Sequence, residues 1–73
     1  MTSPLMHQLG KALRERRVAA GYSQEGFADL IGMHRTYYSA IERGEKNLQL
    51  DTLQKVCLGL KCKPWEVLRE ADA

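Results

Sequence analysis

Arg35 and Thr36 begin a short segment whose side chains are suited to contact DNA bases. An arginine can donate two parallel hydrogen bonds to O6 and N7 of one guanine, and a threonine can meet a base edge or a thymine methyl group. In the helical register expected for residues 35–43, Tyr38 and Ile41 face inward. The alternative for Arg35 is an ordinary exposed arginine at a helix start. We predict that the outward side chains read bases, and these are Arg35, Thr36, Ser39 and Ala40.

Other side chains are suited to hold the phosphate backbone of a duplex. Ser23 and Gln24 stand where a helix is expected to begin, and the free amides and positive dipole end of a helix favour a phosphate. The hydroxyl of Tyr37 can bond to the same kind of oxygen. We therefore predict phosphate contacts from Ser23, Gln24 and Tyr37, with a capped helix start and a solvated Gln24 as the alternative.

The sequence holds no recognisable set of catalytic or metal-binding residues. It has no nucleophile paired with a base, no phosphate-cradling glycine loop and no four-ligand metal pattern. Cys57 and Cys62 have a C-x4-C spacing, but the histidines, His7 and His34, lie far from them in the sequence. We expect both cysteines to be reduced core residues. The sequence thus predicts no enzyme, no cofactor, no metal ion and no small-molecule ligand.

The shortness of the chain limits what it can do. Its 73 residues, 44% of them hydrophobic, can form one domain over residues 1–73 but not a catalytic cleft beside a solid core. Self-association is expected, because a single core of this size supplies only about 3 to 5 kcal/mol. The net charge of +2 is weak support for a nucleic-acid partner. With neither a signal peptide nor a membrane-spanning apolar run, we expect a cytoplasmic protein without a membrane partner.

The spacing of apolar residues predicts five helices and therefore an all-α fold. Ser23 suits the N-cap of the second helix. The second and third helices are separated only by a glycine-containing turn at residues 32–34, and Ala28 is small enough to let them approach closely. Residues 23–44 are therefore predicted to form a helix-turn-helix unit. The expected helices span residues 5–20, 24–31, 35–43, 50–60 and 64–70.

The segment S-Q-E-G-F-A-D-L-I-G-M-H-R-T-Y-Y-S-A-I-E-R-G, residues 23–44, resembles the Xre or Cro/C1-type helix-turn-helix family. This family includes lambda-type phage repressors, antitoxins and restriction-modification controller proteins. The resemblance extends from L-G-K at residues 9–11, through L-D-T-L at 50–53, to P-W-E-V-L at 64–68, and so covers nearly the whole chain. It implies a compact five-helix lambda repressor-like domain that places its third helix in the major groove of double-stranded DNA.

The resemblance also implies roles for residues outside the recognition helix. Arg17 and Glu42 match a partly buried Arg–Glu pair that links the first helix to the end of the third, and this role is structural. Lys46 and Asn47 lie just past the third helix, where related proteins contact the DNA backbone or base edges. We add Lys46 and Asn47 to the predicted phosphate contacts, with a turn and a solvated lysine as the alternative.

We expect a sequence-specific transcription regulator, a repressor or controller protein, that binds as a homodimer to a pseudo-palindromic operator whose half-sites lie about 10 bp apart. The C-terminal helices, residues 50–70, are the expected dimer surface, with Trp65, Val67 and Leu68 as anchors. The alternative for these three residues is the core of a single chain. The alternative function is an antitoxin-like or other protein-interaction module with DNA binding secondary, although the chain lacks the long disordered tail of many antitoxins.

Several positions depart from the family pattern, among them Tyr38, which is bulkier than the usual aliphatic residue. Gly26 lies within the second helix, at a cost of up to about 1 kcal/mol. His34 replaces the usual Ser or Thr cap of the third helix, and Lys61 stands where a C-cap glycine is typical. We expect these residues to weaken local structure more than function.

Overall fold

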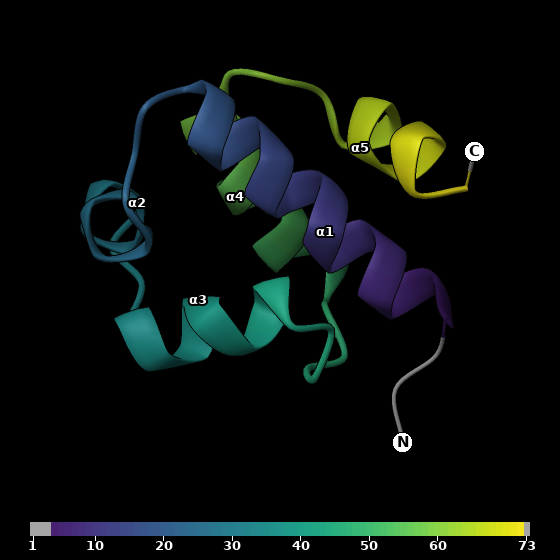
Figure 1. The fold of residues 1–73 in the computed structure, drawn as a ribbon, viewed down its shortest axis with the longest axis horizontal. Coiled ribbons are helices and arrows are strands. Elements are labelled where there is room, and N and C mark those ends of the chain that lie inside the picture. Colours follow the sequence, from purple (N-terminus) through teal and green to yellow (C-terminus); the bar gives the residue numbers. More distant parts are fainter. Residues whose placement is uncertain (1–3, 73) are drawn as a thin grey trace.

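The computed structural model describes residues 4–72, and these residues fold into helices joined by short turns (Figure 1). The predicted all-α class is confirmed, because each predicted helix is present and residues 4–72 contain no strand. No helix in this range is long and apolar enough to span a bilayer. The helices are α1 Pro4–Ala19, α2 Gln24–Leu30, α3 Arg35–Glu42, α4 Leu50–Leu60 and α5 Pro64–Asp72.

The long helix α1 is the centre of the arrangement. It crosses in front of α4 in Figure 1, with α3 below it and α5 on its other side. Its buried Leu13 belongs to one apolar core with Phe27 of α2, Tyr38 of α3, Val56 of α4 and Val67 of α5. Burial of each such side chain contributes on the order of 1.5 to 3 kcal/mol. Every helix thus supplies part of a single core, which fixes α3 against α1.

The prediction that Val67 is a dimer contact is wrong. Its side chain is fully buried, at 0% exposure, because α5 packs along α1 and turns this position into the core of its own chain. Leu68 is half-buried and packs against the same core. Trp65, in contrast, is 59% exposed. Of the three predicted anchors, Trp65 therefore remains the one most open to a second chain.

Gly10 allows α1 to approach the end of α3 very closely. A Cβ atom at this position would lie 2.7 Å from the carbonyl oxygen of Ile41 and closer still to that of Glu42. Both of these neighbours are backbone atoms, which cannot rotate away as a side chain can. A glycine is therefore needed here for its lack of a side chain.

Side-chain caps define the starts of α2 and α3. The Ser23 hydroxyl accepts a hydrogen bond from the Gly26 N–H at 2.9 Å, which confirms the predicted N-cap. His34 is the N-cap of α3, because its Nδ1 accepts a hydrogen bond from the Thr36 N–H at 3.1 Å. The expectation that His34 weakens this helix start therefore overlooks an acceptor that histidine can supply.

Candidate nucleic-acid interface

The first turns of α3 present a polar edge to solvent. Arg35 and Thr36 are exposed, and Ser39 is half-buried one turn further along. Together with Gln24 and Arg43 they line a shallow surface hollow. The backbone of α3 runs along one edge of the molecule in Figure 1, which agrees with the exposure of Arg35 and Thr36. Recognition helices of this kind use their N-terminal residues to contact base edges.

Ala40 does not belong to this edge, and its predicted outward orientation is wrong. The residue is only 5% exposed. Its carbonyl is also engaged, because α3 ends in a turn in which Gly44 has a φ of 74° and the Glu45 N–H donates to the Ala40 carbonyl at 3.0 Å. This turn folds the chain back over the end of the helix. A base contact from Ala40 therefore has no geometric basis.

A buried ion pair joins α1 to the end of α3. The Arg17 Nε donates to Glu42 Oε2 at 2.7 Å, and Nη2 donates to Oε1 at 3.1 Å. The two side chains are only 8% and 2% exposed, respectively. The remaining guanidinium nitrogen donates to the carbonyl of Tyr22 at 2.7 Å, so the pair also anchors the turn before α2. This two-pronged geometry is the strong form of an Arg–carboxylate contact, and it agrees with the structural role expected for Arg17 and Glu42.

Gln24 is hydrogen-bonded to the same carboxylate. Its side-chain Nε2 donates to Glu42 Oε1 at 2.9 Å, and the residue is half-buried. It is therefore not the freely solvated glutamine that was the alternative. Ser23 is exposed beside it, with its hydroxyl oxygen engaged in the cap. Both side chains keep hydrogen-bonding capacity for a phosphate, so those contacts stay predictions.

Burial and hydrogen bonding act in opposite directions on the pKa of Glu42. Burial alone would raise this pKa, but hydrogen bonds from Arg17 and Gln24 stabilise the carboxylate, so that the pKa lies below its ordinary value. The nearby Tyr38 hydroxyl is buried and forms no hydrogen bond of normal geometry within residues 4–72. Its burial, and next the Glu42 carboxylate, raise the pKa of Tyr38. At neutral pH the pair is therefore ionised and the tyrosine neutral.

Arg43 is a cation at this surface that the sequence-based predictions did not single out. Its Nη1 donates to the Ser39 hydroxyl at 2.6 Å and its Nη2 to Glu45 Oε1 at 3.0 Å. It also lines a second hollow with Arg14 of α1, which adjoins the first. The sequence holds one signal for this position: Arg43 follows Ser39 by four residues, and residues four apart share one face of a helix. Arg43 thus lies beside the predicted base-reading edge.

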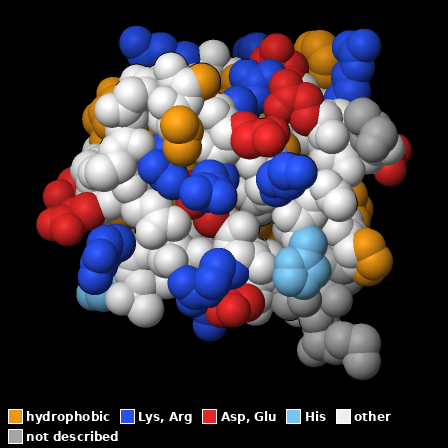
Figure 2. Space-filling model, viewed as in Figure 1, with side chains coloured by type: hydrophobic (Ala, Val, Ile, Leu, Met, Phe, Trp, Pro, Cys, Tyr) orange, Lys and Arg blue, Asp and Glu red, His pale blue; other side chains and the backbone are white. Residues whose placement is uncertain are grey.

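Of the two predicted backbone-contacting residues after α3, Lys46 lies near Tyr37. The Lys46 Nζ is 6.0 Å from the centre of the Tyr37 ring, and Asn47 is exposed in the same loop. In the view of Figure 2, which has α1 in front as in Figure 1, Lys and Arg side chains are spread across the face, with Asp and Glu side chains among them. The face is therefore mixed in charge, as the small net charge of the chain predicts. Within residues 4–72, no group of three or more His, Cys, Asp or Glu side chains could hold a metal ion.

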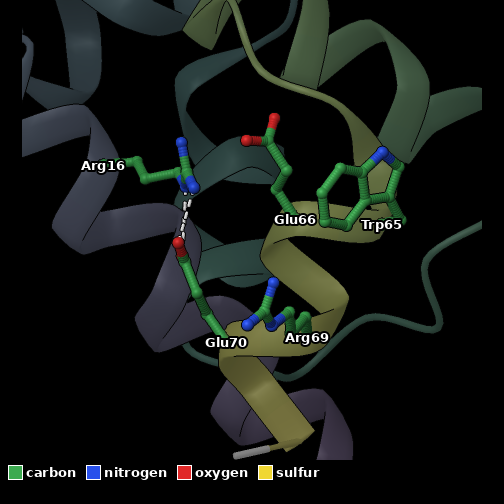
Figure 3. A pocket seen from close by; sticks show the side chains of 5 residues that line it. All are labelled: Arg16, Trp65, Glu66, Arg69 and Glu70. Carbon is green, nitrogen blue, oxygen red and sulfur yellow. Dashed lines mark hydrogen bonds and ion pairs between the residues drawn. The ribbon is translucent and has the colours of Figure 1, made fainter.

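A separate hollow lies between α1 and α5, on the other side of α1 from α3 (Figures 1 and 3). The Arg16 Nε donates to Glu70 Oε1 at 3.0 Å, and this exposed ion pair ties the two helices together. The indole ring of Trp65 stands at one side of the hollow, with Glu66 and Arg69 beside it (Figure 3). Of these residue types, tryptophan and arginine are enriched in protein interfaces.

Comparisons with known proteins identify relatives along nearly the whole chain. The control protein C.BamHI of Bacillus amyloliquefaciens is 36% identical over 69 residues, which cover 93% of this chain and 85% of that protein. The crystal structure of the restriction-modification controller protein C.AhdI from Aeromonas hydrophila matches with a TM-score of 0.81 and 39% identity, covering 85% of this chain and 94% of that one.

The clp gene regulator ClgR from C. glutamicum gives a TM-score of 0.91 at 32% identity, covering 99% of this chain and 92% of that one. A model of the helix-turn-helix family HTH_3 matches residues 13–66, which include all of α2, α3 and α4. The chain therefore belongs to the helix-turn-helix family HTH_3.

Proposed function

We propose that this protein is a sequence-specific transcription regulator that reads duplex DNA with α3 in the major groove. The observation that carries the proposal is the exposed edge of α3, where Arg35, Thr36 and Ser39 stand together on a helix held rigidly by the Arg17–Glu42 pair. A rigid helix gives base contacts a fixed register. The relatives support this function, because their names describe control proteins and gene regulators.

The side chains divide into two groups on this proposal. Arg35 and Thr36 at the helix start, with Ser39, contact base edges, and Arg35 is the main specificity residue because it can bond to guanine at two points. The predicted phosphate contacts flank this edge, and they set the position of α3 without reading sequence. They are Ser23, Gln24, Tyr37, Lys46 and Asn47, to which the structure adds Arg43 as a candidate.

The regulator acts as a homodimer on this proposal. Two copies of α3 about one helical turn of DNA apart would read a pseudo-palindromic operator. Trp65 of α5 is the best candidate for an anchor of the dimer, because its side chain is exposed and tryptophan is enriched among the residues that dominate interfaces. Leu68 is half-buried, so only the exposed part of its side chain could contact a second chain. The similarity to C.AhdI makes restriction-modification genes the first operators to examine.

The experiment that tests the function is selection of bound sites from a random pool of duplex DNA. We expect enrichment of one sequence with two related half-sites about 10 bp apart. Binding to the selected site should weaken steeply with salt and should exceed binding to a scrambled site by at least about 1,000-fold. Enrichment of no sequence, together with equal binding to selected and scrambled DNA, would contradict the proposal.

A further inference from the structure

The C-terminal end of α4 brings the two cysteines of the chain together. Lys61 closes the helix with a left-handed φ of 59°, and the Cys62 N–H then donates to the Cys57 carbonyl at 3.0 Å. This bond is the outer one of a Schellman turn, a helix ending that frequently has a contact between the side chains at these two positions. It also holds the two Cα atoms within about 7 Å, close to the upper limit that a disulfide spans.

The surroundings of the two thiols differ. Cys57 is 1% exposed and belongs to the core, whereas Cys62 is half-buried and packs against that core from outside. Burial raises the pKa of the Cys57 thiol to about 12, and the adjacent Cys62 thiol adds to this shift. Cys57 therefore stays a neutral thiol at pH 7. Cys62 also lines a surface hollow whose charged lining residues are Lys61, Lys63 and Glu66, so a small solute can reach it.

We propose that Cys57 and Cys62 form a reversible intramolecular disulfide by exchange with a small-molecule disulfide such as glutathione disulfide. The accessible Cys62 thiol gives up its proton to water, and its sulfur attacks one sulfur of glutathione disulfide. This breaks that S–S bond and releases one glutathione thiolate, which takes up a proton. The Cys57 thiol then gives up its proton to water and its sulfur attacks Cys62 Sγ, which releases the second glutathione. Two protein thiols are oxidised to one disulfide, and one glutathione disulfide is reduced to two thiols.

The product would be a covalent ring of residues 57–62 at the corner between α4 and α5. The Schellman turn already sets the backbone of this ring, so oxidation requires little rearrangement. The ring ends two residues before α5 and three before Trp65, the candidate dimer anchor. Oxidation would therefore modify the chain next to the surface that we assign to self-association. Disulfide formation itself does not depend on that assignment.

Mass spectrometry of the full-length, folded protein after incubation with glutathione disulfide tests the proposal. The wild type should lose two hydrogen atoms, lose both titratable thiols, and recover both on reduction. Cys57→Ala should instead stop at a stable mixed disulfide between Cys62 and glutathione, because no second thiol can displace it. Cys62→Ser should not react until it is unfolded in urea. Since Cys62 is half-exposed, its replacement by serine is expected to leave the fold intact.

Three results would overturn the proposal. The first is a mixed disulfide that persists in the wild type as it does in Cys57→Ala. The second is a disulfide between two chains in place of one within a chain. The third is a folded wild type that does not react at all while the urea-unfolded chain does.

Discussion

Arg17 and Glu42 form a buried, doubly hydrogen-bonded ion pair that fastens α1 to the end of the proposed recognition helix. The same carboxylate accepts a hydrogen bond from Gln24 of α2, so Glu42 links α3 to both α1 and α2. Burying an ion pair gains little stability by itself, because both charges lose their hydration. The structure indicates that its main effect is geometric, since it fixes α3 relative to the predicted phosphate contacts.

Replacement of Arg17 by alanine should destabilise the protein severely. The substitution leaves the Glu42 carboxylate buried without its cation, which typically costs about 3 to 5 kcal/mol. Urea denaturation followed by circular dichroism measures this loss. Arg16→Ala is the matched control, because the Arg16–Glu70 pair joins α1 to α5 in an exposed position and should contribute at most about 1 kcal/mol. Equal losses in the two variants would mean that burial of the Arg17–Glu42 pair is not decisive.

The stability of the protein should fall in acid because of Glu42. Its pKa in the folded state is lower than the ordinary value of 4.5, so the unfolded state binds a proton more readily. The stabilisation is therefore complete above pH 4.5 and is lost progressively as the pH falls through the folded-state pKa. Urea midpoints between neutral pH and pH 3 measure this change. In Glu42→Gln, stability should fall less steeply between neutral pH and pH 3. If it falls as steeply as in the wild type, other groups cause the loss of stability in acid.

The fold could be predicted from the sequence because its local signals agree with one another. The cap at Ser23, the turn at residues 32–34 and the apolar spacing all give the same helices, and the structure places them within a residue or two. The predictions failed where tertiary contacts decide. Ala40 was assigned outward from its place in the third helix and Val67 to a dimer surface, but Ala40 is buried in the structure and the packing of α5 on α1 buries Val67.

The polar contacts of the candidate site were harder to predict than its position. A sequence gives the spacing of Gln24, Glu42 and Arg43 but not which side chains meet after folding. Gln24 is bound to a carboxylate eighteen residues away, and Arg43 is shared between Ser39 and Glu45. Such pairings depend on how α2 and α3 cross, which only the packed structure specifies.

Arg35→Ala should weaken binding to the selected operator by about 5- to 150-fold, equivalent to 1 to 3 kcal/mol, and should relax base preference at one position of each half-site. Fluorescence anisotropy with the operator and its single-base variants measures both effects. Lys55→Ala is the control, because it removes the same charge from an exposed position on α4 that does not line the hollow beside Trp65. If both variants lost affinity equally for every sequence, Arg35 would be a phosphate contact and not a base-reading residue.

Trp65→Ala should weaken the homodimer by at least about tenfold while leaving the folded monomer intact. The indole ring is 59% exposed, so its removal opens no cavity in the core, whereas large aromatic residues dominate the energetics of interfaces. Sedimentation equilibrium over a range of concentrations measures the dimer dissociation constant. Val18→Ala is a matched control on α1, because Val18 is 57% exposed. An unchanged dissociation constant for Trp65→Ala would place the dimer surface elsewhere.

Lys61→Gly should stabilise the protein by about 0.5 to 1 kcal/mol. Lys61 has a φ of 59°, a left-handed conformation that costs a residue with a Cβ atom roughly 1 to 2 kcal/mol. Glycine avoids this cost, but it loses more conformational entropy on folding, which offsets part of the gain. Lys55→Gly is the control in the same helix. Lys55 is exposed within α4, where glycine should destabilise by about 1 kcal/mol. Thermal unfolding should therefore shift in opposite directions for two substitutions of the same residue type. A loss of stability in Lys61→Gly would mean that the lysine side chain stabilises this turn by more than its backbone strain.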